Sequence, residues 1–153
     1  MDLNTKGRYA VMAMADIAKH GRDDAIPLSV IAERQHISIA YLEQLFLRLR
    51  RAGLVESERG RAGGYRLGRA ASLISVADVM AAVEEPVRMT RCEGEGAVPC
   101  LGAERCLTHG LWEALGTEIA HFLGRVSLQD VIDGLPGEGR GRASSPRHGV
   151  AAE

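Results

Sequence analysis

Residues 30–49 carry two helical patterns separated by a tight turn. The second pattern is stronger, because its apolar residues recur without a gap at i, i+3, i+4 and i+7: Leu42, Leu45, Phe46 and Leu49. Ser38 is the predicted N-cap of this second helix. Residues 30–35 form the shorter first helix with Ser29 as its predicted N-cap, and residues 36–37 form the turn. Two short helices joined in this way are typical of a helix-turn-helix.

A glycine-rich segment follows the second helix and predicts a β-hairpin. Gly53 ends the helix, residues 54–55 begin a strand, and residues 65–67 return as a second strand after a loop at 58–64. The loop glycines let the backbone turn with positive φ and lie close to a duplex. A nucleotide-binding phosphate loop is excluded, because no Gly-Lys-Ser/Thr and no helix directly follow Gly64. The hairpin is therefore predicted to be the wing of a winged helix-turn-helix.

Polar and basic residues on these elements predict contacts with double-stranded DNA. The exposed face and leading turn of the second helix offer polar groups to base edges and arginines to phosphates: Ser38, Tyr41, Glu43, Gln44, Arg48 and Arg51. Arg59 and Arg61 at the hairpin tip are expected to enter a minor groove, whose negative potential deepens where it narrows. A merely solvated amphipathic face is the alternative at this point.

The charge distribution agrees with a polyanionic partner although the whole chain has a net charge of −1. Residues 1–72 hold 12 Lys and Arg against 8 Asp and Glu, whereas residues 73–153 hold 7 against 12. Residues 48–69 contain seven Arg and two Glu, a local excess of +5. Because the local field steers binding, the net charge does not argue against DNA.

Three more helices are predicted outside the helix-turn-helix. The first follows residues 4–5, which can cap it, and has one apolar face: Ala10, Ala13, Met14 and Ile17. Residues 75–83 form another with a capping-box spacing at Ser75 and Asp78 and a buried stripe: Val76, Val79, Met80 and Val83. From Leu107 a long helix runs to about Arg125. Its apolar stripe is wider than one small domain needs, so we expect a homodimer that buries it.

The ends of the chain add little. The longest nearly apolar run, residues 9–15, is far below the ~18 residues of a membrane span, so we expect a soluble protein without membrane contact. Residues 134–153 contain five Gly and two Pro and are predicted to be a disordered tail. The expected division is a DNA-binding domain at 1–72, a cofactor loop with dimerisation helices at 73–133, and this tail.

Three cysteines and a histidine within 18 residues form a candidate four-ligand site: Cys92, Cys100, Cys106 and His109. Thiolates select zinc or iron–sulfur centres, and three cysteines with one histidine suit structural zinc. Zinc sites favour closely spaced cysteine pairs, which are absent here, and this mildly favours a cluster. Idle thiols, one redox disulfide or a catalytic cysteine beside the histidine are the alternatives. An odd cysteine count makes a disulfide framework improbable and favours a reducing compartment.

Four segments carry a resemblance to a known family: residues 5–11 (Thr-Lys-Gly-Arg-Tyr-Ala-Val), residues 39–46 (Ile-Ala-Tyr-Leu-Glu-Gln-Leu-Phe), Arg59-Gly60 with residues 63–67, and Cys106-Leu-Thr-His109. Over residues 1–133 the chain resembles the iron–sulfur-sensing branch of the Rrf-type winged-helix transcription regulators. Nitric-oxide-sensing relatives share the three cysteines but use a carboxylate near the N-terminus, where this chain has Arg8. His109 therefore favours the iron–sulfur-sensing branch over a nitric-oxide-responsive regulator, and a zinc-stabilised regulator is the other alternative.

The resemblance implies a function and a cofactor. It implies a mainly α-helical fold with a small β-hairpin, in which a winged helix-turn-helix precedes a long dimerisation helix. It implies a [2Fe–2S] cluster on Cys92, Cys100, Cys106 and His109, and a homodimeric bacterial cytoplasmic regulator, mainly a repressor, of cluster-assembly genes. Such a protein is not an enzyme, and its dimer symmetry predicts a pseudo-palindromic operator. Glu43 is expected to filter operator sequences, because a carboxylate near DNA is repelled unless it accepts a hydrogen bond from cytosine.

Overall fold

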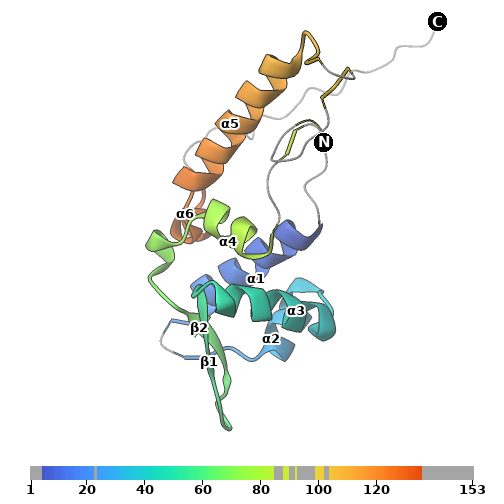
Figure 1. The fold of residues 1–153 in the computed structure, drawn as a ribbon. Coiled ribbons are helices and arrows are strands. Elements are labelled where there is room, and N and C mark those ends of the chain that lie inside the picture. The colour runs from blue at the N-terminus through green and yellow to red at the C-terminus, as the bar shows by residue number, and fades with distance from the viewer. Residues whose placement is uncertain are drawn as a thin grey trace, which may run out of the picture.

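The computed structural model describes residues 5–22, 24–84, 88–89, 92, 99–101 and 104–135. This part is mostly helical, with one antiparallel pair of strands, and the fold class is as predicted (Figure 1). The elements in chain order are α1 (Thr5–His20), α2 (Leu28–Gln35), α3 (Ile39–Arg51), β1 (Val55–Glu58), β2 (Gly64–Leu67), the 3₁₀ helix η1 (Ala71–Leu73), α4 (Val76–Ala82), α5 (His109–Arg125) and α6 (Leu128–Asp133).

The predicted helix-turn-helix is α2 and α3, with one error at its start. Ser38 caps α3 as expected, because its hydroxyl accepts a hydrogen bond of 3.2 Å from the Tyr41 N–H. His36 has φ +54 and supplies the left-handed residue of the turn, which contains no glycine. The prediction of Ser29 as the N-cap of α2 is wrong. Pro27 occupies that position with φ −62, and its carbonyl accepts the first helical hydrogen bonds, so Ser29 lies inside the first turn.

The hairpin β1–β2 projects from one end of the molecule (Figure 1), with Val55 opposite Leu67 and Glu58 opposite Gly64. In the loop, Gly60 has φ +112 and makes the turn that a side chain would strain. Gly64 serves a different purpose, since a Cβ there would lie 2.4 Å from the Ile26 carbonyl carbon. The close approach lets Tyr65 and Ile26 exchange backbone hydrogen bonds of 2.8 and 2.9 Å. Part of the glycine signal thus reflects internal packing of the wing.

One hydrophobic core joins α1, α3, the start of β1, α4 and α6. The predicted stripes of α1, α3 and α4 are all buried, with the α3 residues at most 2% exposed. Leu128 of α6 is also fully buried, so this short helix closes the same core. A buried carboxylate, Asp16 on α1, accepts from Arg34 at 2.5 and 3.0 Å and from Gln35 at 2.7 Å, which fixes α2 against α1. This core holds α3 and the wing in position.

The second half of the described chain differs from the expectation in two places. The capping box at Ser75 and Asp78 is present as predicted, and α5 begins at His109, two residues after the expected start. Helix α6 was not expected, although Ser127 and Asp130 form a second capping box. In the described part of the chain, no helix has both the length and the apolar character needed to span a membrane. The tail that the sequence predicts to be disordered lies outside the described residues from position 136 onward, so that prediction is not tested there.

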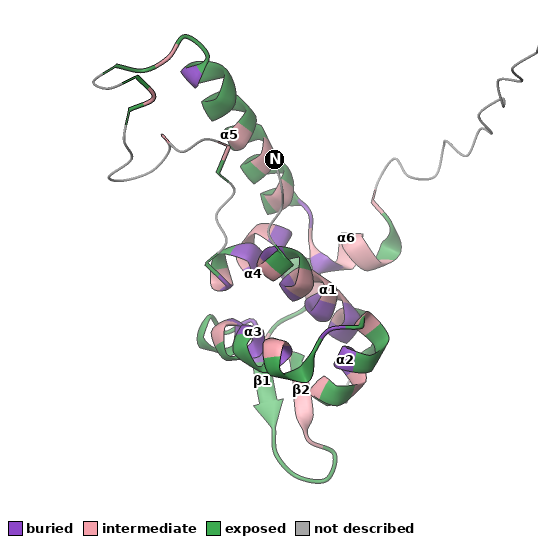
Figure 2. Cartoon of the chain, turned by 90° about the vertical axis from the view of Figure 1, so that its right-hand side faces the viewer, coloured by how far each residue is buried: buried purple, intermediate pink, exposed green. Residues whose placement is uncertain are grey.

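Helix α5 runs from α6 away from the rest of the molecule (Figure 1) and is drawn almost entirely as exposed or intermediate surface (Figure 2). Its single buried residue within the described chain is His109, at its distal N-terminal end. Large apolar side chains on it are exposed: Leu111 60%, Trp112 38%, Leu115 36% and Phe122 48%. Helix α5 therefore presents an apolar face that no other described part of the chain covers.

Candidate DNA interface and candidate metal centre

The exposed face of α3 carries most of the predicted base-reading residues. Ser38, Glu43 and Gln44 are exposed near its N-terminal end, and Arg51 is exposed in its last turn. Tyr41 is half-buried on the flank of α3, where its ring packs edge-on against Tyr9 of α1 with ring centroids 5.9 Å apart. The N-terminal half of α3 thus offers short polar groups to a partner, as a recognition helix does in a major groove.

The hairpin arginines divide into two groups. Arg66 on β2 pairs with Glu56 at 3.0 Å and with Glu58 at 2.9 Å, so its charge is partly neutralised. Arg59 and Arg61 at the tip are exposed and form no ion pair or hydrogen bond with other described residues. The charge available to a polyanion is therefore concentrated at the projecting tip of the wing.

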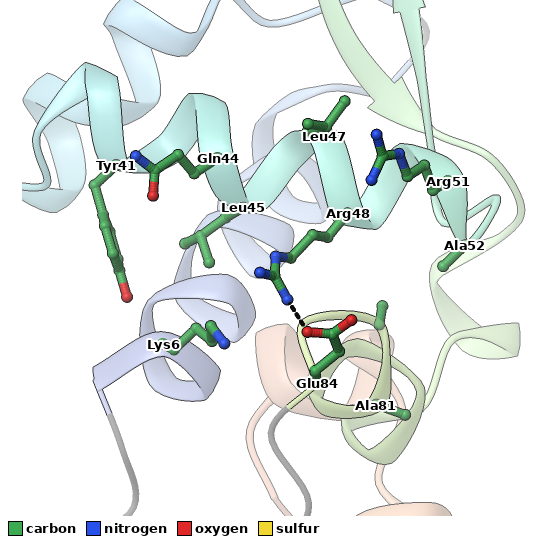
Figure 3. Close-up of a pocket in the computed structure, with 11 residues that line it drawn as sticks. Lys6, Tyr41, Gln44, Leu45, Leu47, Arg48, Arg51, Ala52, Ala81 and Glu84 are labelled. Atoms are coloured by element: carbon green, nitrogen blue, oxygen red, sulfur yellow. Dashed lines mark hydrogen bonds and ion pairs between the residues drawn. The ribbon is translucent and has the colours of Figure 1, made fainter.

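A groove of about 680 Å³ lies beside α3, between the start of α1 and the end of α4. Figure 3 shows Arg48 reaching across it from α3 to Glu84, which follows α4, and the two side chains form an ion pair. Lys6 of α1 and Arg51 of α3 also line this groove. Arg48, predicted to contact phosphates, thus already has an intramolecular partner 36 positions away. Sequence spacing gives no sign of that pair.

Three of the four predicted metal ligands converge at the start of α5. The Sγ atoms of Cys92 and Cys100 lie 3.0 Å apart, and they lie 3.4 and 3.6 Å from His109 Nδ1. These three ligand atoms are all within 4.8 Å of one another. The three cysteines form no disulfide in the described structure. Two soft thiols and an imidazole directed at one point are a donor set for zinc or an iron–sulfur centre.

Cys106 lies next to this group without joining it. Its sulfur is 3.5 Å from the Thr108 hydroxyl, and that hydrogen bond, with a smaller one from the Cys100 thiol, lowers the pKa of Cys106. The pKa of Cys100 is raised. A hydrogen bond from the Cys106 backbone N–H to the Cys100 sulfur lowers the pKa of Cys100. The neighbouring Cys92 thiol, burial and the Cys106 side chain raise it and together outweigh that bond. The two thiols therefore interact with each other, and Cys106 borders the three-ligand group.

His109 is held by its place at the first turn of α5 and is 8% exposed. Its Nδ1 faces the two thiols, while its Nε2 lies 3.9 Å from the Glu113 carboxylate one turn along the helix. A ligating histidine is commonly oriented by a carboxylate at its second ring nitrogen. No hydrogen bond joins the two side chains at this distance, so Glu113 is a neighbour of the ring that the sequence analysis missed, and its i+4 spacing from His109 was the available signal.

Comparisons with known proteins show what the chain is similar to. Residues 3–134 match the family model Rrf2, described as an iron-dependent transcriptional regulator. The chain is 54% identical to the HTH-type transcriptional regulator IscR of Xenorhabdus nematophila over 86% of this chain and 79% of that relative. It is 52% identical to the protein of the same name from Vibrio vulnificus, over 86% of this chain and 77% of that relative.

Two solved structures share the fold. One is IscR of T. potens, which is 37% identical with a TM-score of 0.70, over 87% of each chain. The other is CymR, the global cysteine regulator of B. subtilis, which is 34% identical with a TM-score of 0.72, over 87% of this chain and 97% of that one. The family assignment therefore rests on nearly the whole described chain, including the cysteine-bearing segment.

Proposed function

The chain belongs to the Rrf2 family of transcriptional regulators, and from this premise we propose that an iron–sulfur cluster controls its binding to DNA. As a member of that family the protein is a DNA-binding regulator and not an enzyme. The observation that carries the proposal is the convergence of Cys92, Cys100 and His109 at one end of α5. The iron dependence in the family description and the relatives named IscR support it.

The donor set fits a [2Fe–2S] cluster. Such a cluster takes thiolates, and imidazole replaces thiolate in some of its known forms. Cys92, Cys100 and His109 converge, and Cys106 lies beside them three residues before His109, so the four residues would hold the cluster. When bound, the cluster supplies a centre that can be lost or change its redox state. The chain itself holds His109 at the first turn of α5, and α5 connects the site to the rest of the fold.

The proposed DNA contacts follow the placement of exposed groups. Residues of α3 and its N-cap would read bases in the major groove: Ser38, Tyr41, Glu43 and Gln44. Two arginines of the wing, Arg59 and Arg61, would enter the minor groove. Two arginines late in α3, Arg48 and Arg51, would bind phosphates. A second copy would cover the apolar face of α5, and the resulting homodimer would bind a pseudo-palindromic operator. The regulator would act in the bacterial cytoplasm. It would control the genes of cluster assembly, mainly by repressing them.

Anaerobic purification tests the cofactor. We expect visible absorption together with iron and sulfide in equal amounts. His109→Ala should change the spectrum or shorten the lifetime of the cluster, because imidazole is one of the four ligands. Colourless protein with about one zinc per chain would contradict the proposal, since structural zinc suits the same ligands.

Glu43 remains the proposed selectivity filter of α3. It is exposed, and within the described chain it has no ion pair that would neutralise it. Glu43→Ala should therefore broaden the range of sequences that the cluster-free protein binds. Selection from a random duplex pool measures that range, and an unchanged range would remove Glu43 from the mechanism.

A further inference from the structure

The ion pair between Arg48 and Glu84 joins the recognition helix to the end of α4. Glu84 follows α4 in the left-handed conformation, with φ +58, and its N–H donates to the Ala81 carbonyl at 3.0 Å. Its carboxylate is directed at Arg48 (Figure 3), and the two side chains are 75% and 37% exposed. The pair is therefore open to solvent and to a competing ligand.

The groove around this pair has a strong excess of positive charge. Lys6, Arg48 and Arg51 line it, and Glu84 is the one acidic residue among its lining residues in the described chain. A helix lying in the major groove of DNA has a sugar–phosphate strand along each flank, because the groove is about as wide as the helix. The flank of α3 that carries Arg48 forms one wall of the protein groove beside α3. One sugar–phosphate strand of the DNA would therefore pass along this protein groove.

We propose that Glu84 is an internal competitor of DNA phosphate for Arg48, and that this groove receives a phosphate strand once the carboxylate is displaced. The inference rests on the proposed DNA-binding mode of α3 and adds two residues to it, Lys6 and Glu84. An ion pair between exposed side chains is weak, so a phosphate strand that also meets Lys6 and Arg51 replaces it readily. Glu84 therefore sets the DNA affinity and does not block binding.

Fluorescence anisotropy with a labelled duplex of about 30 base pairs, roughly three helical turns, tests the competition. Glu84→Gln should tighten binding about two- to fivefold, the range set by the strength of an exposed ion pair. Glu33→Gln is the matched control, because Glu33 is an exposed carboxylate on α2 without an ion pair in the described structure. An equal gain in the control, or weaker binding by Glu84→Gln, would overturn the proposal.

A double-variant cycle separates competition from simple loss of negative charge. Arg48→Gln should lower the slope of log K against log salt by about one, the value for one lost phosphate contact. In the Arg48→Gln background, Glu84→Gln should raise the DNA affinity clearly less than it does in the wild type, because the arginine that Glu84 masks is absent. The same gain in both backgrounds, or an unchanged slope for Arg48→Gln, would contradict the proposal.

Lys6 is tested separately against a control on the same helix. Lys6→Gln should also lower the salt slope by about one, whereas Lys19→Gln at the exposed far end of α1 should leave it unchanged. Equal slopes for the two variants would remove the groove from the interface. Wild-type protein that fails to bind the duplex at low salt would instead refute the proposed function, so the two failures are distinguishable.

Discussion

The winged-helix module (residues 5–84 together with α6) and the α5 arm (Cys92 and residues 99–125) differ in how completely the described residues cover their apolar surface. In the module, α1 and α3 turn apolar stripes into a shared core that Val79 and Val83 also enter, and the α3 residues of that core are at most 2% exposed. In the arm, Leu111 and Phe122 remain 60% and 48% exposed, and the contrast is visible in Figure 2.

This difference indicates which region stabilises the fold and which region is proposed to respond to the cofactor. The module has a buried core that fixes the positions of the groups proposed to contact DNA. The arm holds the three converging ligands at its distal end, and its large apolar side chains are exposed within the described residues. We infer that the module folds on its own contacts, while the arm gains its order from a second copy and a bound cluster.

The largest effect is expected at the apolar face of the arm. Leu115→Glu would bury an unpaired carboxylate between two copies of α5 and should raise the dimer dissociation constant by at least about 100-fold. Sedimentation velocity measures the change. Thr117→Glu adds the same charge on the opposite side of α5 and should leave the dimer intact. If both variants dimerise equally well, α5 is not the interface.

The next prediction compares one leucine from each region in the monomeric Leu115→Glu background. Leu45→Ala in the buried face of α3 should lower the free energy of unfolding by about 2–5 kcal/mol, because it leaves a cavity. Leu111→Ala on the exposed face of α5 should change it by less than about 0.5 kcal/mol. Urea unfolding followed by circular dichroism measures both, and similar losses would contradict the contrast between the regions.

A smaller effect is expected at the tip of the wing. Arg59→Ala should weaken DNA binding and lower the salt slope by about one, because it removes a cation that has no partner in the described chain. Arg66→Ala is the control, since Arg66 is already paired with Glu56 and Glu58 and should lower the slope less. Anisotropy titrations across a salt series measure both. An unchanged slope for Arg59→Ala would mean that the tip does not touch DNA.

The smallest effect concerns the capping box of α4. Hydrogen bonds from the Ser75 backbone and hydroxyl, with the Arg69 guanidinium nearby, lower the pKa of Asp78. A lowered pKa in the folded state means that the ionised carboxylate adds stability above its unfolded pKa and loses it as pH falls. Because its side chain is 44% exposed and screened by solvent, Asp78→Asn should lower the free energy of unfolding by less than about 1 kcal/mol at pH 7, and by progressively less below about pH 4. Thermal melts across this range test it, and a cost independent of pH would contradict it.

Periodicity and capping spacings predicted the elements whose side chains share one core. The stripes of α1 and α3 were readable because both face the same interior. The α4 stripe divides between that core, which takes Val79, and a smaller cluster, which takes Val76 and Met80. Helix α6 was missed because six residues are too few for a periodic pattern, although Ser127 and Asp130 repeat the spacing of the box in α4. Ser29 misled because Pro27 also suits a helix start.

Contacts between distant positions are what sequence spacing does not contain. The cysteine and histidine pattern predicted four ligands, while the structure brings three of them together and leaves Cys106 beside them. The buried Asp16–Arg34 pair joins positions 18 apart, and the Arg48–Glu84 pair joins positions 36 apart. Each depends on how α1, α2, α3 and α4 pack, which no local pattern encodes.

The central claim is that the cluster controls DNA binding, and the most direct test measures both states of one preparation. Operator duplexes would be selected from a random pool, and their affinities compared for anaerobic cluster-loaded protein and for the same protein after chelation. The account predicts that the affinities differ for at least one selected sequence. Equal affinities for every selected duplex, with the cluster verified before and absent after chelation, would contradict it.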